Sequence, residues 1–189
     1  MVKKQGIKEV IVSGYERLSY IKEHYGNGER FDCKITYIQL RPDLEQFIEQ
    51  LKPLLDETFL FVNGVSVTDV DLKKANQLHI SRKSQCTILT KDSLRSRAHS
   101  IIVDESGYVR PFDKKKELIG RPSIHTDMYI MEPIAVELLR TFVKRGHIVD
   151  DTPILGCYVD GYWQPINQMD DYQQVQEDIM YGHQSDQVS

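Results

Sequence analysis

The chain has 189 residues, of which 40% are hydrophobic and 28% charged, so its length and composition are those of an ordinary globular domain. Its formal net charge of −4 excludes a broad basic surface for nucleic acid. No apolar run reaches the length of a membrane span, no signal peptide is present, and the 3 cysteines are too scattered for a disulfide framework. We therefore expect a cytoplasmic protein that binds neither membrane nor nucleic acid.

The first half of the chain alternates short apolar runs with amphipathic stretches. Residues 9–13 (EVIVS) form a β-branched run that predicts a buried strand. Residues 1–5 before it resemble the last turn of a helix that stops at Gly6, so the pattern begins in the middle of a motif. In chain order we expect a strand at 9–13, a helix at 15–25, a strand at 34–40, a helix at 43–54, a strand at 58–62, a helix at 72–81 and a strand at 85–89.

The second half contains hairpin signals. The sequence DESG at residues 104–107 and the dipeptide Asp160-Gly161 both favour tight turns between strands. We expect strands at 101–103, 108–112 and 128–131, a hairpin flanked by Tyr158 and Tyr162, and helices at 132–144 and 171–180. One domain over residues 1–180 and a flexible tail at 181–189 complete this prediction.

The order of these elements indicates an α/β protein. Alternating strands and helices predict a mostly parallel sheet with helices on both faces, and the hairpins add an antiparallel portion. Ligands on such sheets bind beyond the carboxyl ends of the strands, which points to residues 63–71.

Two carboxylates in that segment have two interpretations. Asp69 and Asp71 are candidate Mg²⁺ ligands, because Mg²⁺ prefers a few carboxylates together with phosphate oxygens. They are also candidates for capping the helix that begins near Leu72, and we favour this capping interpretation. Residues 114–116 (KKK) form a charge run that favours a solvated hairpin end over phosphate contact.

Several segments, in this order, resemble the sugar-1-phosphate nucleotidyltransferases, also called nucleoside-diphosphate-sugar pyrophosphorylases. The resemblance covers nearly the whole chain and rests on an ordered set of motifs. Those segments are KQGIKEVIVSGYERLSYIKEHYGNGERFDCKITYIQ, LLDETFLFVNGVSVTDVDLKKANQLHISRKSQCTILT, SGYVRPFDKKKE, HTDMYIMEP and DGYWQPINQMDDYQQVQEDIM. It implies a Rossmann-like nucleotidyltransferase fold and the transfer of a nucleotide to a sugar 1-phosphate with the help of Mg²⁺.

The same resemblance implies that the chemical residues are mostly absent. The family's first βα unit, with its Gly-rich phosphate-binding loop, has no counterpart in this chain, which we therefore expect to be truncated. Val65 and Pro165 occupy the positions of the two metal-binding aspartates, and neither side chain can ligate Mg²⁺. Only the lysine of the family's Glu-Lys-Pro survives, as Lys115, and its Asn-Ala-Gly has become His125-Thr126-Asp127.

We therefore predict no catalytic residues, no confident metal site and no confident cofactor. The residues that the resemblance retains near a substrate are Asn63, Gly64, Lys115 and Asp127, with Asp69 and Asp71 as weak metal candidates. Mg²⁺ is expected only if the chain is active.

The predicted function is that of a catalytically inactive partner or regulatory subunit in sugar-nucleotide or polysaccharide biosynthesis. A full-length nucleotidyltransferase or a second copy of the chain is the expected partner. Two alternatives stay open: an active transferase with a reorganised site, and a module that binds a sugar nucleotide without turnover.

Overall fold

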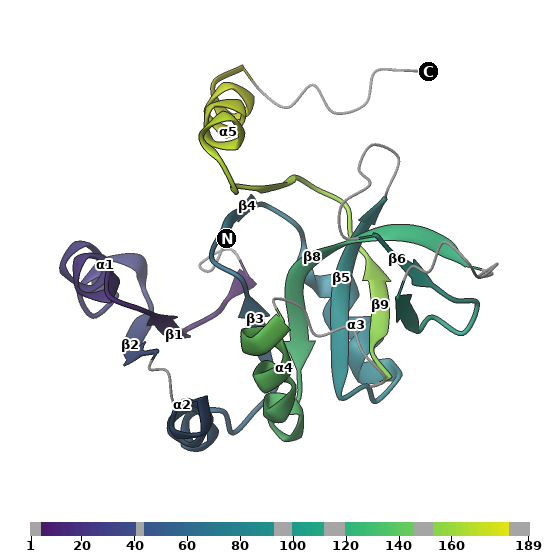
Figure 1. Cartoon of the computed structure of the whole chain (residues 1–189), viewed down its shortest axis with the longest axis horizontal. Helices are drawn as coiled ribbons and strands as arrows, with labels where there is room; N and C mark the ends of the chain where they lie inside the picture. Colours follow the sequence, from purple (N-terminus) through teal and green to yellow (C-terminus); the bar gives the residue numbers. More distant parts are fainter. Residues whose placement is uncertain (1–4, 41–43, 93–99, 112–119, 146–152, 182–189) are drawn as a thin grey trace. The chain divides into compact units, whose positions relative to one another are not determined.

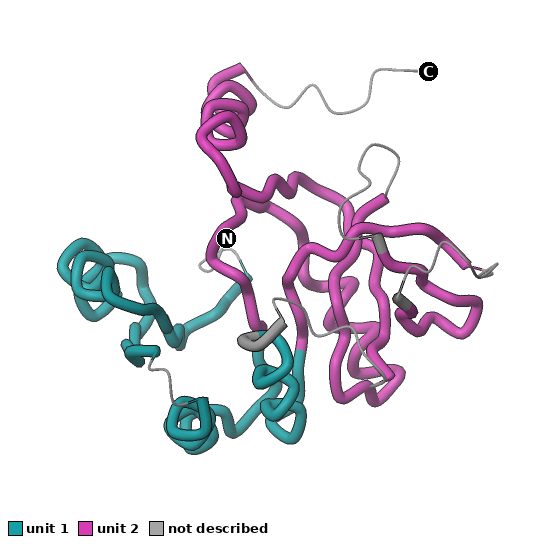
Figure 2. Tube along the Cα trace, viewed as in Figure 1, with its two compact units in different colours: residues 1–59, 131–149 teal, residues 60–130, 150–189 magenta. Residues whose placement is uncertain are grey.

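The chain folds into two compact units (Figure 2). A computed structural model describes residues 5–40, 44–92, 100–111, 120–145 and 153–181. Unit 1 comprises residues 1–59 and 131–149, and unit 2 comprises residues 60–130 and 150–189. The prediction of one domain over residues 1–180 stays a prediction. Of the predicted tail, Tyr181 ends a helix and residues 182–189 lie outside the described residues.

Unit 1 contains a two-stranded parallel sheet and a helix between its strands (Figure 1). Strand β1 (Glu9–Gly14) leads to helix α1 (Leu18–Tyr25), a short 3-10 helix (Glu29–Phe31) and strand β2 (Lys34–Gln39). Gly28 has a φ of 91°, and a Cβ there would lie 2.6 Å from the Cys33 carbonyl oxygen, so only glycine fits this turn. Strand, helix and strand fall where the sequence predicts them, although α1 begins three residues later than expected.

Two further helices complete unit 1. Helix α2 (Leu44–Leu51) buries Phe47, Ile48 and Leu51, and a 3-10 turn (Lys52–Leu54) follows it. A second 3-10 turn (Pro133–Glu137) leads into helix α4 (Leu138–Arg145). Arg140 on α4 forms ion pairs with Glu45 on α2 and with Glu137, and Lys52 lies 3.0 Å from Glu137. These pairs link α2 to α4.

Unit 2 is built on a mixed sheet with the strand order β7-β6-β8-β5-β9, and β3 pairs with β8 (Figure 1). Strand β5 is parallel to β9, whereas β6 is antiparallel to both β7 and β8. The strands are β3 (Phe59–Val62), β5 (Cys86–Asp92), β6 (Ser100–Val103), β7 (Val109–Pro111), β8 (Arg121–Met131) and β9 (Leu155–Tyr158).

The core of unit 2 lies along β5 and β8. Ile88, Leu89, Met128 and Tyr129 are 0% exposed. Helix α3 (Leu72–Ser81) contacts β5 and buries His79, whose Nδ1 lies 2.8 Å from Thr87 Oγ1. A buried polar side chain of this kind is tolerated because it is hydrogen-bonded.

The last part of unit 2 corrects one prediction. Tyr158 and Tyr162 do not flank a hairpin, because β9 pairs with β5 while the following strand β10 (Trp163–Pro165) pairs with β4 (Ser66–Thr68). The two strands on either side of Asp160-Gly161 thus join different sheets. Helix α5 (Met169–Tyr181) ends the described chain. No helix among the described residues is long and apolar enough to cross a membrane.

The turn at residues 104–107 is confirmed as a hairpin. The Gly107 N–H donates to the Asp104 carbonyl at 2.8 Å, and the Asp104 carboxylate accepts from the N–H groups of Ser106 and Tyr108. These backbone bonds, together with Arg110, lower the pKa of Asp104 against the opposing effect of its burial.

Candidate functional site

The carboxyl end of β3 meets β8 at the segment that the sequence singles out. The Asn63 N–H donates to the Asp127 carbonyl at 3.0 Å, so these two predicted substrate-binding residues are neighbours. Gly64 follows on the exposed side of this junction, and a Cβ there would meet nothing within 4 Å. The predicted residue Lys115 lies outside the described residues.

Asp127 is held against a buried histidine. Its Oδ1 lies 2.8 Å from His125 Nδ1, and the two side chains are 25% and 6% exposed. Asp127 has a φ of 55°, a left-handed conformation that aspartate tolerates better than most residues. Backbone strain of this kind often lies at functional sites. The resemblance singled out Asp127 as a substrate-binding residue, but no sequence pattern predicted its contact with His125.

The two positions at which the resemblance places metal-binding aspartates are brought together. The Ile166 N–H donates to the Val65 carbonyl at 2.7 Å, and Pro165 pairs with Ser66 across the β4–β10 ladder. The Val65 side chain is exposed, with 47% of its surface open. The backbone at these two positions is therefore close, and neither residue carries an oxygen in its side chain.

Asp69 and Asp71 make internal hydrogen bonds. Asp71 is the N-cap of α3, and its carboxylate accepts from the Lys73 N–H at 2.9 Å. Asp69 Oδ1 accepts from the Tyr162 N–H at 2.6 Å and so ties the α3 entrance to the segment before β10. Asp71 therefore caps α3, whereas Asp69 accepts a hydrogen bond from the backbone of a distant residue.

Gly161 and Tyr162 complete this junction between β4, β10 and α5. Gly161 has a φ of 92°, and a Cβ on it would lie 2.8 Å from Asp69 Oδ1, so the close approach requires glycine. The Thr68 hydroxyl donates to the Tyr162 carbonyl, and the Tyr162 hydroxyl donates to Asp178 on α5 at 2.8 Å. Burial and the bond to Asp178 raise the pKa of Tyr162.

These residues do not fit a magnesium ion. Mg²⁺ in proteins is usually bound through one or two carboxylates, which Val65 and Pro165 lack, and Asp69 and Asp71 each use one carboxylate oxygen to accept a backbone N–H. Within the described part of the chain, no three His, Cys, Asp or Glu side chains come together as a metal-binding group.

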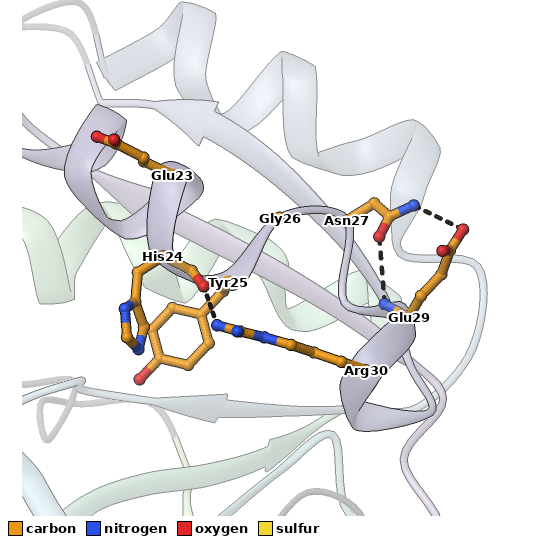
Figure 3. Close-up of a pocket in the computed structure, with 7 residues that line it drawn as sticks. All are labelled: Glu23, His24, Tyr25, Gly26, Asn27, Glu29 and Arg30. Carbon is orange, nitrogen blue, oxygen red and sulfur yellow. Dashed lines mark hydrogen bonds between the residues drawn. The ribbon is translucent and has the colours of Figure 1, made fainter.

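An open pocket of about 310 Å³ lies elsewhere, in unit 1 (Figure 3). It is formed by the end of α1 and the turn after it, with the Arg30 guanidinium beside Tyr25 and donating to the His24 carbonyl. Asn27 and Glu29 hydrogen-bond to each other at its rim. None of Asn63, Gly64 or Asp127 lines this pocket.

Comparison with known sequences finds enzymes of one reaction type. The chain is 23% identical over 203 residues to UTP–glucose-1-phosphate uridylyltransferase of Synechocystis, covering 93% of this chain and 52% of that enzyme. It is 28% identical over 184 residues to D-glycero-α-D-manno-heptose 1-phosphate guanylyltransferase of Campylobacter jejuni, covering 90% of this chain and 79% of the enzyme. The chain thus spans about half the length of the first relative. No family model matches it.

Comparison with solved structures gives the same fold. The structure of HddC from Yersinia pseudotuberculosis, complexed with GMP-PN, superposes with a TM-score of 0.71 at 17% identity. The superposition covers 94% of this chain and 81% of HddC. At this identity the likeness establishes the fold.

Proposed function

The chain is a homologue of the sugar-1-phosphate nucleotidyltransferases with their fold, and from that premise we propose that it has lost catalysis and acts as a partner or regulatory subunit in sugar-nucleotide or polysaccharide biosynthesis. The observation that carries this proposal is the bond from the N–H of Ile166, the residue after Pro165, to the Val65 carbonyl. The two positions expected to hold Mg²⁺ lie together, and neither side chain is a metal ligand.

The electrostatic demands of the reaction support this proposal. Phosphoryl transfer depends on positioning and on neutralising the charge that develops on the phosphates. Asp69 and Asp71 lie outside the two positions at which the resemblance places the metal-binding aspartates, and each accepts a backbone N–H, from Tyr162 and Lys73, that holds the scaffold.

The deciding experiment is a turnover assay. The purified chain is incubated with Mg²⁺, a panel of nucleoside triphosphates and a panel of sugar 1-phosphates, and pyrophosphate release is measured. We expect no release above background, while the Synechocystis uridylyltransferase in the same assay serves as the positive control. Sustained release that depends on the chain would overturn the proposal and favour the active alternative.

The partner role needs a separate measurement. The chain is titrated into an active nucleotidyltransferase encoded in the same genome, and both complex formation and the rate of the enzyme are followed. The proposal predicts a complex together with a changed rate. An enzyme whose rate and sedimentation stay the same at saturating amounts of the chain would contradict it.

Binding without turnover is a second candidate, favoured by the bond between Asn63 and Asp127. That bond keeps the strand end, Gly64 and a carboxylate–imidazole pair in one place without any metal. Calorimetric titration with guanosine and uridine nucleotides and their sugar conjugates tests it, and heat that is lost in an Asn63→Ala variant would support it. An identical heat in the variant, or none in the parent chain, would argue against this site.

A further inference from the structure

Helix α5 buries little of its apolar surface (Figure 1). Of its 13 residues, Val175 is buried, whereas Ile179, Met180 and Tyr181 are 66%, 73% and 83% exposed. The whole chain leaves this much of these side chains open, so unit 2 alone covers no more of them. A helix of this length is marginal in water unless tertiary packing holds it. The apolar packing that would hold α5 to unit 2 is therefore small.

A hydrogen bond joins α5 to the segment before β10. The Tyr162 hydroxyl donates to Asp178 Oδ2 at 2.8 Å, and the other oxygen of this carboxylate accepts from Gln174 Nε2 at 2.8 Å. Gln174 lies one turn before Asp178 on the same helix, so its amide helps to orient the carboxylate. A hydrogen bond to an ionised acceptor is stronger than one between neutral groups. This hydroxyl is therefore well placed to hold the helix.

The backbone of Tyr162 is held separately from its side chain. Its N–H donates to Asp69 Oδ1 at 2.6 Å, and its carbonyl accepts from the Thr68 hydroxyl at 2.8 Å and from the Asp69 N–H at 3.1 Å. These bonds fix the backbone to the end of β4, whereas Asp178 on α5 is bound through the far end of the ring. Loss of the hydroxyl should consequently free α5 without loosening the junction with β4.

We propose that α5 opens as a unit from the rest of unit 2, and that the Tyr162 hydroxyl is the group that keeps it closed. Local opening needs little free energy where few apolar contacts are broken, as is the case for α5. Opening would uncover Val175 and the part of β10 that α5 contacts. The inference goes beyond the proposed function, because it holds whether or not the chain has lost catalysis.

Hydrogen exchange of the full chain, followed by mass spectrometry, tests this proposal, since the exchange rate of an amide follows the population of its open state. Peptides from residues 169–181 should exchange on the order of a hundredfold faster than peptides from residues 86–92 in the core strand β5. In Tyr162→Phe, exchange in α5 should rise by about a further tenfold, while α3 and β5 stay the same. The matched control is Tyr172→Phe, which removes a phenol hydroxyl on α5 itself and should change neither.

A second variant, Asp178→Ala, separates the hydrogen bond from intrinsic helix propensity. Alanine favours a helix more than aspartate does, so α5 would exchange more slowly if propensity governed its opening. The proposal predicts faster exchange of α5, as in Tyr162→Phe. Exchange of α5 as slow as that of β5 in the parent chain, or slower exchange in Asp178→Ala, would overturn it. Equal rates in the two tyrosine variants, or acceleration of α3 and β5 together with α5, would do the same.

Discussion

Asp127 holds a backbone conformation that few side chains adopt, beside a histidine that its carboxylate contacts. The resemblance places this residue at a family glycine, and its φ of 55° explains why glycine suits the position. The backbone at this position therefore does not require a carboxylate. Having aspartate in place of the family glycine adds the contact with His125.

Comparing two variants at Asp127 separates strain from contact. Asp127→Gly and Asp127→Ala both remove the carboxylate from His125, but only glycine relaxes the left-handed backbone. We expect the alanine variant to be less stable than the glycine variant by about 1 kcal/mol in urea unfolding. Equal stabilities would mean that the positive φ carries no cost here.

The buried thiol of Cys86 makes the stability of the fold depend on pH. The thiol is 1% exposed, and burial raises its pKa from 9.0 to about 12. The folded protein therefore holds this proton more tightly than the unfolded chain. The associated stability is complete below about pH 9 and is lost as pH rises toward 12.

We expect the free energy of unfolding to fall above pH 9 by up to about 1.4 kcal/mol per pH unit from this group. Urea unfolding at pH 7, 8, 9 and 10 measures the slope. Other groups also titrate in this range, so the comparison is with Cys86→Ala, which should show a shallower slope. Parallel slopes for the two proteins would assign the effect to other residues.

At the scale of elements, α3 shows how a polar residue near a predicted site serves the scaffold. Asp71 caps the helix through the Lys73 N–H, and the helix spans the residues expected from its sequence pattern. Strand β8 shows the opposite outcome. Only residues 128–131 were expected, yet the strand runs from Arg121 to Met131 because its polar first half is paired with β6.

Asp71 distinguishes capping from metal binding. Asp71→Ala should destabilise the protein by about 1 kcal/mol, whereas Asp71→Ser, which also caps, should cost only a few tenths. Thermal unfolding followed by circular dichroism measures both. A metal ligand would behave differently, because serine would then be as damaging as alanine and the difference would appear only with Mg²⁺ present.

At the scale of the whole molecule, the two compact units carry different features. Unit 1 holds the open pocket, whereas unit 2 holds Asn63, Gly64, Asp127 and the contact between Val65 and Ile166. The β1–β2 sheet lies in unit 1, and the β4–β10 pair lies in unit 2. Substitutions in one unit can therefore be chosen as controls for the other.

A ligand that binds only the folded state raises the melting temperature, and the rise grows with the logarithm of its concentration once that exceeds the Kd. We expect millimolar Mg²⁺ to leave the melting temperature unchanged, because Val65 and Pro165 provide no carboxylate. The variant carrying both Val65→Asp and Pro165→Asp should respond to Mg²⁺, with Ca²⁺ and salt of equal ionic strength as controls. A Mg²⁺-dependent shift of the parent chain that is absent in the controls would contradict the proposed loss of the metal site.

The sequence by itself determined most of the regular elements of the α/β fold. Alternating β-branched runs and amphipathic stretches mark β1, β2, β3, α2 and α3, because each periodicity follows from local geometry. The ordered motifs also identified the relatives, and the side chains at Val65 and Pro165 suggested a lost metal site before any contact was known.

Only the tertiary structure decided how distant segments pair. The turn signal at Asp160-Gly161 predicted a hairpin, but β9 pairs with β5 and β10 pairs with β4. The three residues of β4 are too few and too polar to predict a strand by themselves. The bond from Tyr162 to Asp69 likewise joins residues far apart along the chain. Pairing of this kind is set by the packing of the whole fold, which no local pattern of residues encodes.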